Sequence, residues 1–129
     1  MISLRIVTPL GLYRQVDTSI LNLETVGGWI GILPSHMPIV STLKVSHMTT
    51  EEDGKRQNYA VAGGLLYFKD DKAIILSDAV ESEEDIDVSR AAEARDRAME
   101  RLSRQDGVVD TQRAEAALKR AINRLRLKE

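Results

Sequence analysis

The chain has 129 residues, of which 43% are apolar and 29% charged, and it contains no cysteine. This composition is typical of a globular protein and excludes a disordered one, and the length allows one ordinary domain or a smaller one with an appendage. Without cysteine there are no disulfides and no thiolate chemistry, which fits a reducing compartment. The opening residues 1–14 lack the layout of a signal peptide, and no run approaches the roughly 20 apolar residues that span a bilayer. We therefore expect an intracellular protein that is not itself inserted in a membrane.

The formal net charge of −2 conceals a difference between the two parts of the chain. Residues 1–85 carry 7 basic and 12 acidic side chains together with all five aromatic ones, whereas residues 86–129 carry 11 basic and 8 acidic side chains. The change falls near residues 81–85. We expect two domains, one over residues 1–84 and one over residues 85–129.

Residues 1–84 have the pattern of a β-sheet protein. Apolar residues alternate or form short β-branched runs, most clearly at residues 2–6, 20–23, 59–61, 65–68 and 73–76. Glycine and proline interrupt these runs about every 8 to 12 residues, a spacing typical of a β-sandwich or barrel. The pattern predicts eight to ten short strands. It also predicts a hairpin over residues 65–78, because Asp70 and Asp71 tolerate turn dihedrals.

From Ile86 onward the apolar period changes from two to about 3.6, which predicts two amphipathic helices separated by residues 105–107. One expected apolar face comprises Val88, Ala91, Ala92, Ala98, Met99 and Leu102, and the other comprises Ala114, Ala117, Leu118, Ala121, Ile122 and Leu125. Asp87 or Asp85 can cap the first helix, Gly107 can end it, and Asp110 can cap the second. Because alanine contributes little apolar area, we expect a weakly held hairpin that has access to a second state.

The helical part places arginines at regular intervals. Arg90 and Arg97 are seven residues apart, and Arg120 and Arg124 are four apart. Like charges at such spacings repel each other unless an anion lies between them. The alternative is a solvated basic face paired with acidic neighbours, namely Glu93, Asp96, Glu100 and Glu115. Spacing alone leaves both interpretations open.

Other classes of site find little support in the sequence. The pairs Gly27-Gly28 and Gly63-Gly64 are not followed by the Lys-Ser/Thr of a phosphate loop, which favours turns. His36 and His47 have no further ligands at metal spacing. No Ser, His and Asp grouping accompanies a nucleophile motif, so we expect no catalytic residue. Nucleic-acid binding would rest on the net charge of +3 carried by residues 86–129, a segment that has no aromatic side chains to stack on bases.

Four strings in order carry a family resemblance. They are Gly-Ile-Leu-Pro-Ser-His-Met-Pro at residues 31–38, Ala-Val-Ala-Gly-Gly at residues 60–64, Ile-Asp-Val-Ser-Arg-Ala at residues 86–91, and the alanine-rich and arginine-rich segment at residues 113–125. Together they resemble the epsilon subunits of bacterial F-type ATP synthases over the whole chain. The resemblance implies a ten-stranded β-sandwich followed by an antiparallel two-helix hairpin.

The resemblance also implies a function. The chain would be a non-catalytic rotor subunit in the central stalk, with its sandwich contacting the gamma subunit and the ring of c subunits. It would couple proton-driven rotation to ATP synthesis without making or breaking a bond itself. Its location would be the cytoplasmic side of the cell membrane, peripherally and through the complex only.

An ATP site is implied by the same family. Its motif matches Ile86, Asp87, Arg90 and Ala91, and the remaining implied positions are Glu81, Arg97, Arg120 and Arg124. Guanidinium groups can hold phosphates through charge-assisted bonds, while carboxylates accept from the base or ribose. ATP, alone or with Mg, would act as a regulatory ligand that stabilises the folded hairpin. When ATP is scarce, the helices would extend to the alpha and beta subunits and inhibit hydrolysis.

One departure from the family pattern concerns Trp29, the only tryptophan, which stands where the family commonly has an acidic residue. The indole either folds back over the sandwich or contacts the c-ring loops or gamma. A rival interpretation of the whole chain is a free-standing sandwich adaptor whose basic hairpin docks on another protein or on nucleic acid.

Overall fold

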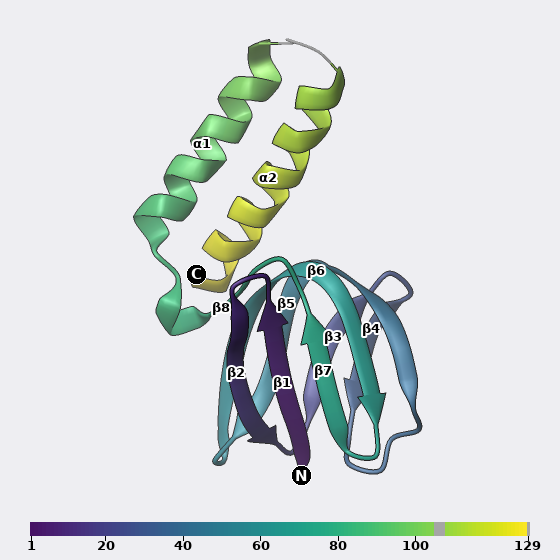
Figure 1. Ribbon diagram of the computed structural model, residues 1–129. Helices are drawn as coiled ribbons and strands as arrows, with labels where there is room; N and C mark the ends of the chain where they lie inside the picture. Colours follow the sequence, from purple (N-terminus) through teal and green to yellow (C-terminus); the bar gives the residue numbers. More distant parts are fainter. Residues whose placement is uncertain (105–107, 129) are drawn as a thin grey trace. The chain divides into compact units, whose positions relative to one another are not determined.

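The computed structural model describes residues 1–104 and 108–128, without the side chains of residues 104 and 108–110. Within it the chain divides into two compact units, Met1–Glu83 and Glu84–Glu129. The first unit contains the strands and the second contains the helices (Figure 1). This arrangement confirms the predicted class of a β-sandwich followed by a two-helix hairpin.

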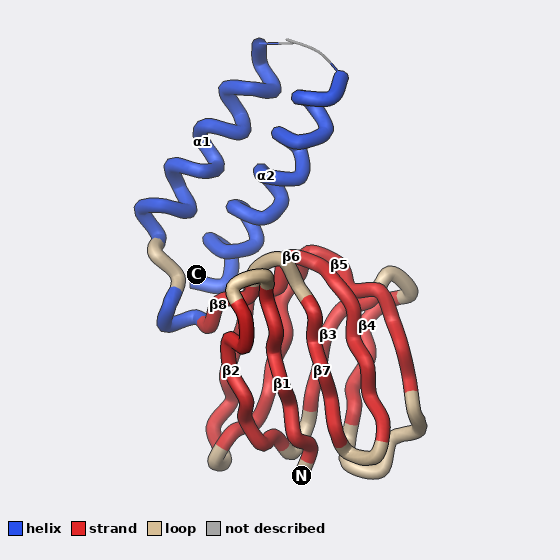
Figure 2. The backbone as a smooth tube through the Cα atoms, viewed as in Figure 1, coloured by secondary structure: helices blue, strands red, loops and turns tan. Residues whose placement is uncertain are grey.

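The sandwich unit consists of eight strands folded into two layers (Figure 2). The strands are β1 (Ile2–Thr8), β2 (Gly11–Thr18), β3 (Leu21–Thr25), β4 (Gly28–Ile32), β5 (Ile39–Glu52), β6 (Lys55–Lys69), β7 (Lys72–Leu76) and β8 (Val80–Ser82). They follow the order β2-β1-β7-β6-β5-β3-β4, with β8 paired to β6. All neighbours are antiparallel except β1 and β7.

The expected number of ten strands is wrong, because two of the eight run on through a bend. Pairing of β5 with β6 is interrupted at Lys44 and Gly63 and then continues with Val45 opposite Ala62. Gly63 and Gly64 both have positive φ, and a Cβ on Gly64 would lie 2.0 Å from the Leu76 carbonyl oxygen. The sequence predicted a turn at these glycines, but they lie at a bend inside β6 and not in a turn between two strands.

Alternating inward residues form the core of the sandwich. On β1 the side chains of Ile2, Leu4 and Ile6 are fully buried, as the period-two pattern requires. The predicted hairpin over residues 65–78 is confirmed, since β6 pairs with β7 and both Asp70 and Asp71 adopt positive φ. Burial of the inward-facing apolar side chains is the main contribution to the stability of the sandwich unit.

A 3₁₀ turn, Glu83–Asp85, spans the boundary between the two units, and the helical unit continues with α1 (Val88–Arg104) and α2 (Val108–Lys128). The Arg90 N–H donates to Asp87 Oδ1 at 3.1 Å, so Asp87 is the N-cap of α1. The expected stop at Gly107 lies outside the described residues. Because α2 begins at Val108, Asp110 lies in its first turn, and the expectation that it caps this helix is wrong.

The two helices pack through alanines. Four of them are buried: Ala91, Ala98, Ala114 and Ala121. We call this set the alanine seam. Val88 and Met99, which were expected on the packed face, remain about half exposed, at 48% and 54%. The seam is therefore narrower than the sequence pattern predicted.

Candidate functional site

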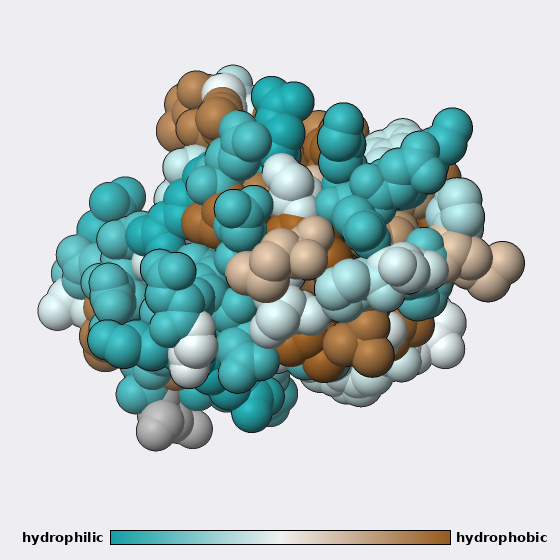
Figure 3. All heavy atoms as spheres, turned by 90° about the horizontal axis from the view of Figure 1, so that it is seen from below, coloured by the Kyte–Doolittle hydropathy of each residue, from teal (hydrophilic) through white to brown (hydrophobic). Residues whose placement is uncertain are grey.

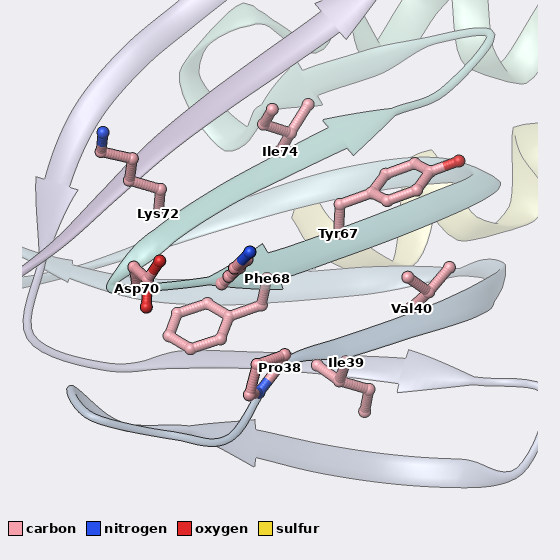
Figure 4. A pocket seen from close by; sticks show the side chains of 9 residues that line it. Pro38, Ile39, Val40, Tyr67, Phe68, Asp70, Lys72 and Ile74 are labelled. Carbon is pink, nitrogen blue, oxygen red and sulfur yellow. The ribbon is translucent and has the colours of Figure 1, made fainter.

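An apolar hollow of about 540 Å³ lies on the outer face of the sandwich, across β5, β6 and β7 (Figure 4). Val40 on β5 is opposite Tyr67 on β6, and Tyr67 is opposite Ile74 on β7. These three side chains form one outward row, and Val40 remains 65% exposed. We call this row and the hollow that it lines the outer apolar face. Apolar side chains that stay in contact with water in this way mark an interaction surface.

Charged residues border the hollow at the β6–β7 turn. Lys69, Asp70 and Lys72 line it there, and Figure 4 labels Asp70 and Lys72. The next turn residue, Asp71, accepts a hydrogen bond from the Ser35 N–H at 2.6 Å. This bond ties the loop after β4 to the β6–β7 turn. The result is an apolar surface with a polar rim, the usual anatomy of a protein interface.

The same end of the sandwich carries further exposed apolar side chains. Leu33 and Met37, on the loop between β4 and β5, are both exposed. Seen from below, apolar atoms gather among polar ones on this face of the molecule (Figure 3). His36 on the same loop packs edge-on against Phe68, with ring centroids 5.8 Å apart, which orients the loop.

Trp29 is 55% exposed on β4. Its ring lies against that of His47, with centroids 5.8 Å apart and a tilt of 47°. The indole therefore keeps more than half of its surface in water instead of folding into the sandwich. An exposed indole is available to a partner.

A polar cluster inside the sandwich is structural. The fully buried Tyr59 donates from its hydroxyl to Glu52 Oε2 at 2.7 Å, and Arg14 Nη1 donates to the same hydroxyl at 3.4 Å. Arg14 Nη2 also donates to Ser82 Oγ at 3.3 Å, which links β2 to β8. Burial, assisted by the bond to Glu52, raises the pKa of Tyr59 to about 12. The cluster joins β2, β5, β6 and β8 through these side chains.

The arginines implied for nucleotide binding lie in the helical unit. Arg90 and Arg97 immediately precede Ala91 and Ala98 of the alanine seam, and Arg120 immediately precedes Ala121. In two antiparallel right-handed helices, the positions just before the seam lie on the same side of the pair. Arg124 is one turn after Arg120. We call this side, with Asp87 at its start, the arginine flank.

The opposite side of the hairpin has a different lining. A hollow of about 410 Å³ there is bordered by apolar and basic residues, namely Val88, Arg95, Ile122, Leu125, Arg126 and Lys128. None of the implied nucleotide residues borders this hollow. The basic residues of the unit are thus divided between two sides.

Glu81, the remaining implied residue, belongs to the sandwich unit. It lies on β8, where it pairs with Ala60 of β6. Its neighbour Ser82 receives the bond from Arg14 and donates its backbone N–H to the Tyr13 hydroxyl at 2.9 Å. Glu81 therefore occupies a strand that side chains of β2 hold in place.

The outer apolar face was missed in the sequence, although a signal was present. The run Leu65-Leu66-Tyr67-Phe68 is apolar on both faces of its strand, which indicates a strand covered on both sides.

Among residues 1–104 and 108–128, no three His, Cys, Asp or Glu side chains could hold a metal ion together. The same part of the chain contains no helix long and apolar enough to cross a membrane.

Comparison with known proteins places the chain among ATP synthase subunits. Residues 1–83 match the family model of the ATP synthase delta/epsilon chain β-sandwich domain, and residues 84–129 match that of its long α-helix domain. An ATP synthase epsilon chain of Bacillus licheniformis is 42% identical over 96% of this chain and 95% of the relative. One of Caldicellulosiruptor bescii is 41% identical over 98% and 92%, respectively.

Two solved structures share the fold. A chain in the mitochondrial ATP synthase of Euglena gracilis, in a structure comprising OSCP, F1 and the c-ring, matches with a TM-score of 0.75. It is 23% identical, over 92% of this chain and 75% of that one. A chain in the central stalk and c-ring of the Tetrahymena thermophila mitochondrial enzyme matches with a TM-score of 0.68 and 14% identity, over 99% and 96%.

Proposed function

The chain belongs to the delta/epsilon chain family of ATP synthases, and from that membership we propose that it is a non-catalytic central-stalk subunit of a proton-translocating F-type ATP synthase. In this role it couples rotation of the c-ring to ATP synthesis in the catalytic head. The observation that carries the proposal is the outer apolar face, because a rotor subunit without an active site acts only through its contacts.

The outer apolar face is the proposed contact for the gamma subunit. Val40, Tyr67 and Ile74 form an apolar row, and the lysines of the β6–β7 turn border it. Burying one such side chain fully stabilises a complex by about 1.5–3 kcal/mol. Three neighbouring side chains thus form the centre of an interface, and the lysines can pair with carboxylates at its edge.

Recovery of the gamma subunit on the tagged chain tests this contact. Val40→Asp places a charge in the interface and is expected to abolish stoichiometric recovery. Val26→Asp is the matched control, because Val26 is equally exposed, at 63%, but lies in the β3–β4 turn. Equal recovery by both variants would exclude the outer apolar face as the contact.

We propose that the c-ring meets the end of the sandwich that carries Leu33 and Met37. The hydrogen bond from Ser35 to Asp71 and the packing of His36 on Phe68 hold this loop in one conformation. A loop that is already ordered loses less entropy on binding. Through these contacts the chain is peripheral to the membrane, on its cytoplasmic side.

The arginine flank is the proposed ATP site. Arg90 and Arg97 come from α1, and Arg120 and Arg124 come from α2, so a triphosphate between them would bridge the helices. Asp87, at the start of the flank, can accept a hydrogen bond from the base or ribose. A ligand at about a hundred times its dissociation constant stabilises the state that binds it by about 2.7 kcal/mol. The alanine seam is weak enough for this amount to decide between a folded and an extended hairpin.

Calorimetric titration with MgATP tests this site. Arg90→Ala and Arg124→Ala are each expected to weaken binding by about tenfold or more, because each removes a charge-assisted hydrogen bond. Arg126→Ala, on the opposite side of the hairpin, is the control and is expected to bind as the wild type does. If none of these substitutions changes the heat of binding, the arginine flank is excluded as the ATP site.

Inhibition of hydrolysis follows from the same two states. Without ATP the helices extend toward the alpha and beta subunits, where the basic side chains of α2 meet acidic segments and oppose rotation in the hydrolysis direction. With ATP bound, the folded hairpin keeps these side chains away from the catalytic head.

A further inference from the structure

Strand β4 is an open edge of the sheet. It is the last strand in the order β2-β1-β7-β6-β5-β3-β4, and within the described residues it pairs with β3 alone. Its other side therefore presents backbone N–H and C=O groups to a further strand. Most proteins protect such edges with charged residues, proline or a bulge. The sequence of β4, Gly-Trp-Ile-Gly-Ile, contains neither a charge nor a proline.

The opposite edge strand, β2, is protected in the ways that β4 is not. It carries Arg14, and its register with β1 shifts between Ile6 and Val7. Its end is also tied to β5, because the Ser19 N–H donates to the Glu51 carbonyl at 3.2 Å and the Glu51 N–H donates to Thr18 Oγ1 at 2.9 Å. A third edge strand, β8, pairs with β6 alone within the described residues, but it is only three residues long and carries Glu81. Among these edges, β4 is therefore the one best suited to pair with another strand.

The side chains of β4 are arranged so that the strand can pair with a copy of itself. Trp29 and Gly31 face outward and are exposed, whereas Ile30 is half-buried and Ile32 is buried. In an antiparallel pair centred on Ile30, Trp29 of each chain lies opposite Gly31 of the other, on the same outer face. The indole can then lie over a residue without a side chain, which is a favourable cross-strand pairing. On the inner face, the two Ile30 side chains meet and extend both cores.

We propose that the free chain forms a weak symmetric homodimer through antiparallel pairing of its β4 edges, with the two-fold axis at Ile30. Such an interface is isologous, since each chain supplies the same strand. The pairing buries much less than the roughly 1,600 Å² of a standard interface, so the dimer is transient. The formal charge of −2 on each chain opposes association only slightly. Joining the two edges also removes both unprotected strands from solvent.

Glycine is required at position 31 for this arrangement. A Cβ at Gly31 would already lie 3.0 Å from Asn22 Oδ1 of the neighbouring strand β3. A side chain there would also occupy the place of the other chain's indole. Trp29 and Gly31 are thus complementary across the two-fold axis.

Cysteine cross-linking tests the register, and the absence of natural cysteines makes single substitutions unambiguous. Residues directly opposite each other in an antiparallel pair have Cα atoms about 4.5–5.5 Å apart, which a disulfide spans. Under mild oxidation Ile30→Cys is expected to give a covalent dimer. Asn22→Cys, on β3, is the control and is expected to stay monomeric. Failure of Ile30→Cys to cross-link, or equal cross-linking of both variants, would overturn the proposal.

Sedimentation equilibrium on the isolated full chain gives an independent measurement that requires no other subunit. The wild type is expected to show a concentration-dependent monomer–dimer equilibrium. Trp29→Glu is expected to raise the dissociation constant by about tenfold or more, because it removes two cross-strand pairs and adds two charges. Leu12→Glu, at a similarly exposed site on the edge strand β2, is expected to leave the dissociation constant unchanged. A wild type that is monomeric at every concentration, or equal effects of both variants, would contradict the pairing.

Discussion

Tyr59→Phe removes one hydroxyl from the buried polar cluster of the sandwich. In the wild type this hydroxyl donates to Glu52 Oε2 at 2.7 Å. Hydrogen bonds to charged groups contribute about 1.5–3 kcal/mol, so the substitution is expected to lower the free energy of unfolding of the sandwich by about 2 kcal/mol at neutral pH. Tyr67→Phe is the control, because the Tyr67 side chain lies on the exposed outer apolar face.

Ionisation of the Tyr59 hydroxyl makes the stability of the wild type depend on pH, which Tyr59→Phe cannot reproduce. Burial and the bond to Glu52 raise the pKa of Tyr59 from 10.0 to about 12. Because the folded-state pKa is raised, the stabilisation is complete below pH 10 and is lost as the pH rises through about 12. Because burial is the largest cause of the raised pKa, the stability lost on ionisation mainly reflects desolvation of the phenolate, with the bond to Glu52 second.

Urea denaturation followed by Trp29 emission, at a protein concentration low enough to keep the chain monomeric, measures this loss. The stability gap between the wild type and Tyr59→Phe is expected to narrow between pH 10 and about pH 12. A loss no larger than that of Tyr67→Phe, or a gap that stays constant through this range, would refute the reasoning.

Three further substitutions test the fold. Gly64→Ala is expected to lower the free energy of unfolding by about 3 kcal/mol or more, because φ is +123° and the new Cβ would lie 2.0 Å from the Leu76 carbonyl oxygen. Gly54→Ala is expected to lower it by about 1 kcal/mol, because φ is +75° but no atom lies within 4 Å of the new Cβ. Urea denaturation compares the two, and equal losses would contradict the close approach at Gly64. Asp87→Ala removes the N-cap of α1 and is expected to destabilise the helical unit by about 1 kcal/mol. The loss is measured as a lower Tm in circular dichroism at a helical wavelength. The control Asp96→Ala, at an exposed position inside α1, is expected to lower the Tm less. Ala98→Leu overfills the alanine seam and is expected to lower the free energy of unfolding of the helical unit by about 1–3 kcal/mol. The stability of the sandwich, measured by Trp29 emission, is expected to stay unchanged. An unchanged unfolding transition of the helices would show that the seam is loosely packed.

Much of the fold was predictable because its signals are local. The change of apolar period at Ile86 separates strands from helices, and the turn at Asp70 and Asp71 follows from residues that tolerate positive φ. The cap at Asp87 was one of two expected alternatives, and the hydrogen bond to the Arg90 N–H distinguishes it from Asp85.

Features that depend on tertiary packing were not predictable. Whether Gly63 and Gly64 end a strand or bend one depends on the strands around them, so the pattern predicted a range of eight to ten strands and the structure has eight. The exposure of Val88 and Met99 reflects the close approach of helices that meet through alanine, which leaves larger residues outside the seam. The sequence left two interpretations of the Trp29 indole open, because its exposure depends on which face of β4 it occupies.

The candidate sites divide in the same way. Spacing along the helices placed Arg90 with Arg97 and Arg120 with Arg124, but only the antiparallel seam puts both pairs on one side of the hairpin. The outer apolar face combines residues from three strands that are distant in the sequence, and their register cannot be read from one segment.

The central claim is that this chain is a rotor subunit whose helical unit responds to ATP, and the hydrolysis rate of the assembled enzyme tests it most directly. The rate is measured over a range of ATP concentrations with the wild-type chain and with Arg90→Ala, which removes a proposed phosphate contact from α1 and leaves the basic residues of α2 intact. We predict that the wild-type enzyme is inhibited at low ATP and released as ATP rises, whereas the Arg90→Ala enzyme stays inhibited at concentrations that release the wild type. Release of both enzymes at the same ATP concentration would contradict the account.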